Sequence, residues 1–346
     1  MVPVLFGAAS AVFFGAADFI GGFAAKRIVA MMVTGCAALA GVIALGFAAP
    51  LAGGVWYAET WIGGILTGIA SCLGIWLLYS AYAVGPMTTL SPVVAIVSTL
   101  VPMVAGLLTG ETFSPLGWVA VTVGLIAIGL VSAAPDPRSS RARRVDVVKV
   151  AAAGAFLGVF YIYLDGGFWN VHVDEAGLTP LLANRTTCAI VAFGIVAALA
   201  IRGRGVVIGH GNPTAQAHVL PAAEAVLAGR GAAGPADQSM SGQPTDSVGT
   251  AGSRTGSVTA PRSARRLVLI SAVPLALLSG TLDATANTLF SFGLEVGDLA
   301  VLSVVSGFYP AVTVGLAYFV LRERPNRLQS VGIVLSLVSL AGMSLA

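Results

Sequence analysis

The sequence contains few charged residues, and this scarcity limits the kinds of protein that it can encode. Only 10% of its 346 residues are Asp, Glu, Lys or Arg, whereas 57% are hydrophobic. A soluble domain carries about 25% charged residues, so this chain could not cover a surface that faces water. The composition therefore predicts a protein that lies in a lipid bilayer.

Cysteine, histidine and lysine are also scarce, and each scarcity excludes a kind of chemistry. The three cysteines all fall inside long apolar runs and the three histidines all fall outside them, so we expect neither a disulfide framework nor a metal site. The chain has no Walker-type phosphate loop and only two lysines, which argues against direct use of ATP. We therefore predict no catalytic residues, no cofactor and no metal, and the chain is not expected to be an enzyme.

Long apolar runs are abundant instead. About 20 consecutive apolar residues span the hydrocarbon core of a bilayer as a helix, and only helices or closed barrels can satisfy their backbone there. The runs are too long and too continuously apolar to be barrel strands. The sequence thus predicts an all-α integral membrane protein with ten transmembrane helices at 3–22, 28–50, 61–83, 88–110, 115–134, 150–168, 178–201, 267–292, 299–320 and 328–346.

The basic residues lie on one side of this arrangement. Of the 18 Lys and Arg residues, 17 fall in connections that follow odd-numbered runs, and the opposite connections carry only acidic residues. Because cytoplasmic loops collect Lys and Arg, the odd-numbered connections are predicted to face the cytoplasm and both termini to face outward. The net charge of +3 is then a signal of topology and gives no support for nucleic-acid binding.

One of these connections, residues 203–265, differs from the others in composition. It is rich in Gly, Ala, Ser, Thr and Pro, which predicts a largely disordered segment. Binding of an unidentified partner, or regulation, is one interpretation of this loop. A tolerated insertion is the other and is favoured.

The two halves of the chain resemble each other. A shift of 147 residues aligns "GAASAVFFGAAD" at 7–18 with "GAFLGVFYIYLD" at 154–165, and a shift of 212 aligns Glu111 with Glu323. The chain therefore reads as two five-helix repeats, 1–135 and 150–346, joined by a basic linker at 136–149, with the 203–265 insertion in the second repeat. Because five is odd, the second repeat is inverted in the membrane, an architecture typical of secondary transporters.

These features resemble the EamA-type carriers of the drug/metabolite transporter superfamily. The resemblance rests on the five-plus-five duplication, the "GAAD" of the first run, the "GE" after the fourth and the stretch 306–345. It implies a ten-helix carrier in the cytoplasmic membrane for small metabolites, often an exporter of amino acids or related solutes. It also implies cytoplasmic termini, whereas the charge distribution places them outside, so both orientations stay open.

Four charged residues fall inside the predicted membrane helices: Asp18, Asp165, Arg185 and Asp283. Charges at membrane depth are costly and usually functional. The repeat pairs Asp18 with Asp165, one near each face, as an alternating-access carrier would need. Arg185 could take the carboxylate of a zwitterionic substrate; a salt bridge that only fixes helix packing is the equal alternative.

Uncharged residues complete the candidate site. Asn287 lies one turn beyond Asp283 on the same helix face, and Trp76, Tyr82 and Tyr309 are added as candidate cavity residues, with Tyr79, Tyr161 and Tyr163 as weaker ones. Tyr and Trp are also ordinary anchors at the membrane interface.

The leading hypothesis is a secondary active transporter in the cell membrane, in contact with lipid, that exports small organic solutes and could couple transport to a proton. An integral-membrane enzyme, and a channel or sensor that uses the 203–265 loop as its output, are the alternatives.

Overall fold

The computed structural model describes residues 1–85, 87–132, 144–167, 173–202, 262–321 and 327–345. Apolar stretches bounded by glycine, proline and polar connections form helices throughout this part of the chain. The helices are α1 (Val2–Ala25), α2 (Ala30–Ala52), α3 (Ala58–Val84), α4 (Met87–Thr109), α5 (Pro115–Ser132), α6 (Arg144–Leu164), α7 (Val173–Ala176), α8 (Thr179–Ile201), α10 (Arg262–Leu294), α11 (Leu299–Ser306), α12 (Tyr309–Leu321) and α13 (Arg327–Leu345).

The predicted all-helical membrane fold is confirmed. Every predicted apolar run corresponds to a helix, except that two helices, α11 and α12, form the ninth. Within the described residues, five helices (α1, α2, α3, α6 and α8) can cross a membrane by length and composition, and four shorter apolar stretches lie in α4, α5, α11–α12 and α13. The chain is therefore a multi-pass membrane protein, while ten crossings stay a prediction.

Some predicted boundaries need correction. Residues 144–149 of the predicted linker belong to α6, whose first turn is held by an ion pair between Lys149 and Asp146 at 3.4 Å. A search for apolar runs misses this turn because it contains charged residues. Helix α6 also ends at Leu164, earlier than predicted, so Asp165 lies beyond the spanning helix. Of the predicted insertion, 203–261 lie outside the described residues and 262–265 belong to α10.

The ninth run is broken between Ser306 and Tyr309. Pro310 lies in the first turn of α12, where its missing N–H and fixed φ suit a helix start but prevent α11 from continuing. Gly307 occupies the break, where a side chain would collide with Thr99 of α4. The break places Tyr309 at the start of α12.

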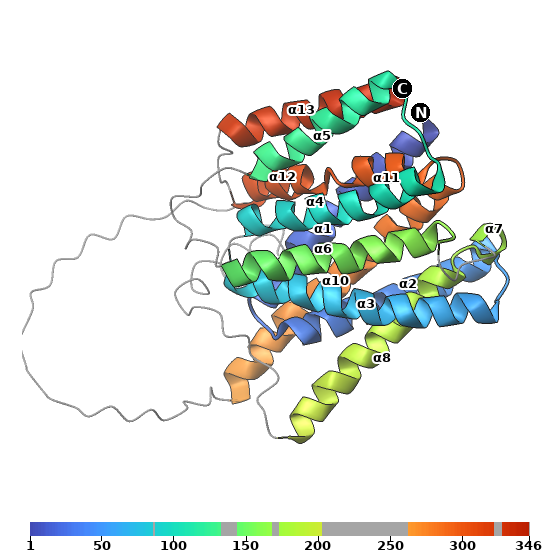
Figure 1. Cartoon of the computed structure of the whole chain (residues 1–346). Helices are drawn as coiled ribbons and strands as arrows, with labels where there is room; N and C mark the ends of the chain where they lie inside the picture. The colour runs from blue at the N-terminus through green and yellow to red at the C-terminus, as the bar shows by residue number, and fades with distance from the viewer. Residues whose placement is uncertain (86, 133–143, 168–172, 203–261, 322–326, 346) are drawn as a thin grey trace, which may run out of the picture.

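The two ends of the helix bundle are shown in Figure 1. Both termini lie on the right of the view, and α1, α3, α5, α8 and α12 end on the left. Among the described residues, the connections after odd-numbered runs thus lie at one end of the bundle and those after even-numbered runs at the other, as the sequence predicts. Helices α1 and α6 run in opposite directions, as an inverted repeat requires.

The helix contacts made by one half have counterparts between the equivalent helices of the other half. Helix α1 packs on α10 and on the α11–α12 pair, and α6 packs on the equivalent α3 and α4. Helix α2 packs on α10 as α8 packs on α3, while α2 packs on α8 and α5 on α13. This pattern is what a duplicated five-helix unit would produce, although the inverted repeat itself stays a prediction.

Glycines that the two repeats share make equivalent close contacts. A Cβ on Gly7 of α1 would lie 2.8 Å from a methyl group of Val305 in α11, and a Cβ on Gly154 of α6 would lie 2.7 Å from the main-chain oxygen of Val94 in α4. Small residues let membrane helices approach closely. The first helix of each half is therefore held tightly against the other half.

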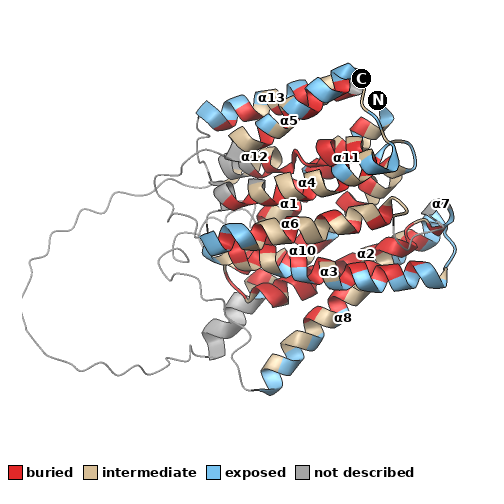
Figure 2. Cartoon of the chain, viewed as in Figure 1, coloured by how far each residue is buried: buried red, intermediate tan, exposed pale blue. Residues whose placement is uncertain are grey.

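The outer surface of the bundle is apolar. In Figure 2 buried residues gather where helices face one another, and exposed residues line the outside. Large hydrophobic side chains are among the exposed ones, including Phe47, Leu108, Ile190 and Leu337. Such a surface suits a lipid environment and would be unstable in water.

Candidate functional site

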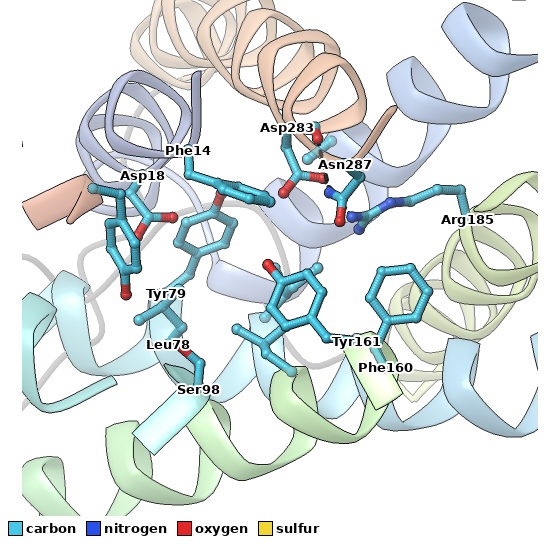
Figure 3. Close-up of a pocket in the computed structure, with 14 residues that line it drawn as sticks. Phe14, Asp18, Leu78, Tyr79, Ser98, Phe160, Tyr161, Arg185, Asp283 and Asn287 are labelled. Carbon is cyan, nitrogen blue, oxygen red and sulfur yellow. Dashed lines mark hydrogen bonds and ion pairs between the residues drawn. The ribbon is translucent and has the colours of Figure 1, made fainter. Parts of the chain in front are cut away.

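A cavity lies between helices of both halves (Figure 3). It contains about 660 Å³ of space not filled by protein atoms, part of it open to the outside. Its lining comes from α1, α2, α3, α4, α6, α8, α10 and α12: Phe14, Asp18, Ala37, Ile75, Leu78, Tyr79, Ser98, Leu157, Phe160, Tyr161, Arg185, Asp283, Asn287 and Tyr309.

An ion pair crosses one end of the cavity. A guanidinium nitrogen of Arg185 on α8 lies 2.6 Å from a carboxylate oxygen of Asp283 on α10. The arginine side chain is only 5% exposed and the aspartate 28%, so the carboxylate is the more accessible partner. The guanidinium also lies 5.9 Å from the ring centre of Phe160. Asn287 donates to the main-chain oxygen of Asp283 at 2.8 Å, which fixes the amide one turn away.

A second carboxylate, Asp18 on α1, lines the cavity without a matching cation. Among the described residues, no hydrogen bond or ion pair reaches its side chain. The neighbouring polar groups are bound to one another: the Tyr79 hydroxyl lies 3.1 Å from the Ser279 hydroxyl, which donates to the main-chain oxygen of Ala17 at 2.8 Å. The Asp18 charge is therefore free to meet a ligand.

Aromatic rings fill the space between the two carboxylates. Tyr161 lies at the centre, 4.6 Å from the ring of Phe290 and 6.2 Å, edge to face, from Phe14. Tyr309 on α12 donates to the main-chain oxygen of Ser91 at 3.4 Å, which holds its ring at the wall. The cavity thus combines an apolar aromatic body with charged groups at its edges (Figure 3).

The sequence profile of the EamA-like transporter family matches residues 257–345. Those residues are similar in sequence to that family. The family resemblance drawn from the sequence is thereby confirmed in the second half, which supplies Asp283, Asn287 and Tyr309 to the cavity.

The comparison with solved structures extends the fold likeness to the whole chain. A crystal structure of a protein with 16% sequence identity has a TM-score of 0.59 and is matched over 99% of this chain and 96% of its own. At this identity the likeness concerns the fold alone. No curated protein sequence matches the chain.

Five of the eight predicted site residues line the cavity: Asp18, Arg185, Asp283, Asn287 and Tyr309. The other three lie elsewhere. Trp76 is 36% exposed on the outside of α3, and Tyr82 is 1% exposed and packed in the core. Asp165 follows the end of α6.

Two phenylalanines that wall the cavity, Phe14 and Phe160, were not among the candidates from the sequence. Phe14 precedes Asp18 by one helical turn and therefore shares its face, a spacing visible in the sequence. Nothing in the sequence distinguishes Phe160 from the other phenylalanines in the apolar runs. Tyr79 and Tyr161, the weaker candidates, do line the cavity.

Asp165 belongs to a different group of carboxylates. Glu111, at the end of α4, accepts hydrogen bonds from the main-chain nitrogens of Leu299 and Ala300 at 3.0 and 2.8 Å and so caps the start of α11. Burial, and then the charges of Glu111 and Asp298, raise the pKa of Asp165 to about 7. Glu111 is therefore a framework residue that ties the two halves together at the face where the termini lie.

This environment predicts how Asp165 affects stability. A carboxyl group whose pKa rises on folding contributes stability that is complete below its unfolded pKa, near 3.8, and is lost as pH rises through about 7. Asp165→Asn removes the charge, so we expect the melting temperature of the variant to rise relative to wild type by about 1–3 °C between about pH 4 and about pH 7. Thermal unfolding in detergent measures this difference. A pH-independent difference would contradict the assigned environment.

Proposed function

We propose that this protein is a secondary active transporter that moves small organic solutes across the cytoplasmic membrane by alternating access, in the outward direction that the family resemblance implies. The observation that carries the proposal is the cavity. Helices from both halves wall it, and charged residues from both halves line it. A site at the interface between repeats is where secondary transporters bind their substrates.

Contacts at the face of the termini support a gating role for that end. The main-chain nitrogen of Val55, before α3, donates to the main-chain oxygen of Glu175 in α7 at 2.8 Å, and the Tyr57 hydroxyl donates to the Glu175 carboxylate. That hydrogen bond raises the pKa of Tyr57. With the Glu111 cap on α11, these contacts join the two halves at one face, and alternating access would require them to break.

Counterflow in proteoliposomes tests the proposal. Vesicles that contain the full chain are loaded with pooled unlabelled metabolites, and uptake of each labelled compound from outside is followed. A carrier is expected to accumulate its labelled substrate transiently above the outside concentration, because exit of unlabelled substrate drives entry.

Protein-free vesicles provide the baseline for that experiment. Equilibration without transient accumulation would indicate a channel, and chemical conversion of a compound would indicate an enzyme. Either result would overturn the proposed function.

A further inference from the structure

We infer that the cavity takes an organic cation, an amine with an apolar body and no carboxylate of its own. This inference rests on the proposed function and specifies the substrate class of the same site. It differs from the zwitterion suggested by the sequence, in which Arg185 binds the substrate carboxylate.

The first observation is the charge balance of the lining. Its charged members are Asp18, Asp283 and Arg185, which sum to one negative charge when all are ionised. Arg185 is already paired with Asp283 at 2.6 Å, and the charge left over belongs to Asp18. An unmatched charge in a low-dielectric site is costly, and a cationic ligand would remove that cost.

The second observation is which groups the cavity exposes. The Arg185 side chain is 5% exposed, its Nε is buried without a hydrogen-bond partner, and its stem packs against Gly41 of α2. Asp283 is 28% exposed. Of the ion pair, the carboxylate is therefore more accessible to a ligand than the guanidinium. A ligand carboxylate could replace Asp283 only by separating the ion pair.

The third observation concerns the hydrogen-bond donors that could otherwise hold a carboxylate. The Asn287 amide donates to Asp283, and the Tyr309 hydroxyl donates to Ser91. The Tyr79 hydroxyl is engaged by Ser279. These three donors are engaged within the protein and offer little to an anionic group, whereas the Tyr161 hydroxyl, which no hydrogen bond in the described residues engages, can accept from an ammonium group.

The aromatic wall of the cavity also favours a cationic ligand. Phe14 lies one turn from Asp18 on α1 and meets Tyr161 edge to face at 6.2 Å, with Phe160 beside them. Aromatic faces attract cations within about 6 Å of the ring centre, and the rings also fit an apolar body. A carboxylate beside aromatic rings is thus suited to an ammonium group that carries a hydrophobic substituent.

Matched ligands test the inference on the full chain in lipid nanodiscs. Within each set the apolar body is the same, and the ligands differ in whether they carry an amine, a carboxylate or both. One set is phenethylamine, phenylalanine and 3-phenylpropionate; the second is 3-methylbutylamine, leucine and 4-methylpentanoate. In at least one set we expect the amine to bind at least about tenfold more tightly than the amino acid, and the acid to show no binding. Titration of each ligand gives the dissociation constants.

Two variants test whether the preference for the amine depends on the Asp18 carboxylate. Asp18→Asn should reduce the preference for the amine at least about tenfold, whereas Glu59→Gln, which removes an exposed carboxylate at the start of α3 outside the cavity, should leave it unchanged. Tighter binding of the amino acids, equal binding within each set, or no binding of either amine overturns the inference. The proposed carrier function is judged separately by counterflow, which can succeed with a neutral or zwitterionic solute when the cation inference fails.

Discussion

Replacing Arg185 with glutamine is expected to destabilise the protein strongly. The guanidinium is the cation of a buried ion pair with Asp283, and its removal leaves two unmatched carboxylates, Asp18 and Asp283, in the same cavity. Breaking a buried pair by removing one partner costs about 3–5 kcal/mol. We therefore expect Arg185→Gln to show a much lower melting temperature and poor recovery from the membrane.

A double-mutant cycle separates the ion pair from other effects. Combining Arg185→Gln with Asp283→Asn removes both charges and should restore much of the lost stability. Arg202→Gln, which removes an exposed arginine at the end of the same helix α8, should leave the melting temperature unchanged. A stable Arg185→Gln protein that has lost only substrate affinity would instead support the role suggested by the sequence.

Much of the fold could be predicted from the sequence because the bilayer imposes a simple length rule on apolar runs. The rule located every long helix in the described residues, but it could not place ends set by local chemistry. Polar turns that extend a helix, such as the start of α6, do not register as apolar. The break at Gly307 and Pro310 is also hidden, because the residues around it are as apolar as the rest of the run.

The candidate site was only partly predictable for a related reason. The scarcity of charge in the apolar runs pointed to Asp18, Arg185 and Asp283, which do line one cavity. The alignment of the repeats also paired Asp18 with Asp165, yet α1 continues to Ala25 whereas α6 ends at Leu164. Gly166, with a φ of +94°, follows that end and favours termination of the helix. Aligned positions therefore lie in different environments.

Asp18→Asn is expected to nearly abolish transport while leaving the protein at least as stable as wild type. Among the described residues, the Asp18 side chain has no ion pair or hydrogen bond to lose, so the substitution breaks no contact. It removes an unmatched charge from a site walled largely by apolar and aromatic groups. The same charge is the one left to pair with a cationic substrate, and losing one partner of such a pair costs about 2–5 kcal/mol of binding.

That cost corresponds to a loss of initial transport rate on the order of a hundredfold at low substrate concentration. Counterflow and thermal unfolding on the same preparation measure the two effects together. Glu295→Gln, an exposed carboxylate at the end of α10, is the matched control and should change neither. If Asp18 were a packing residue, its removal would lower the melting temperature and leave the rate of the surviving protein intact. A stable variant with almost no transport therefore identifies a carboxylate that serves the ligand, and a destabilised variant with normal transport would contradict that role.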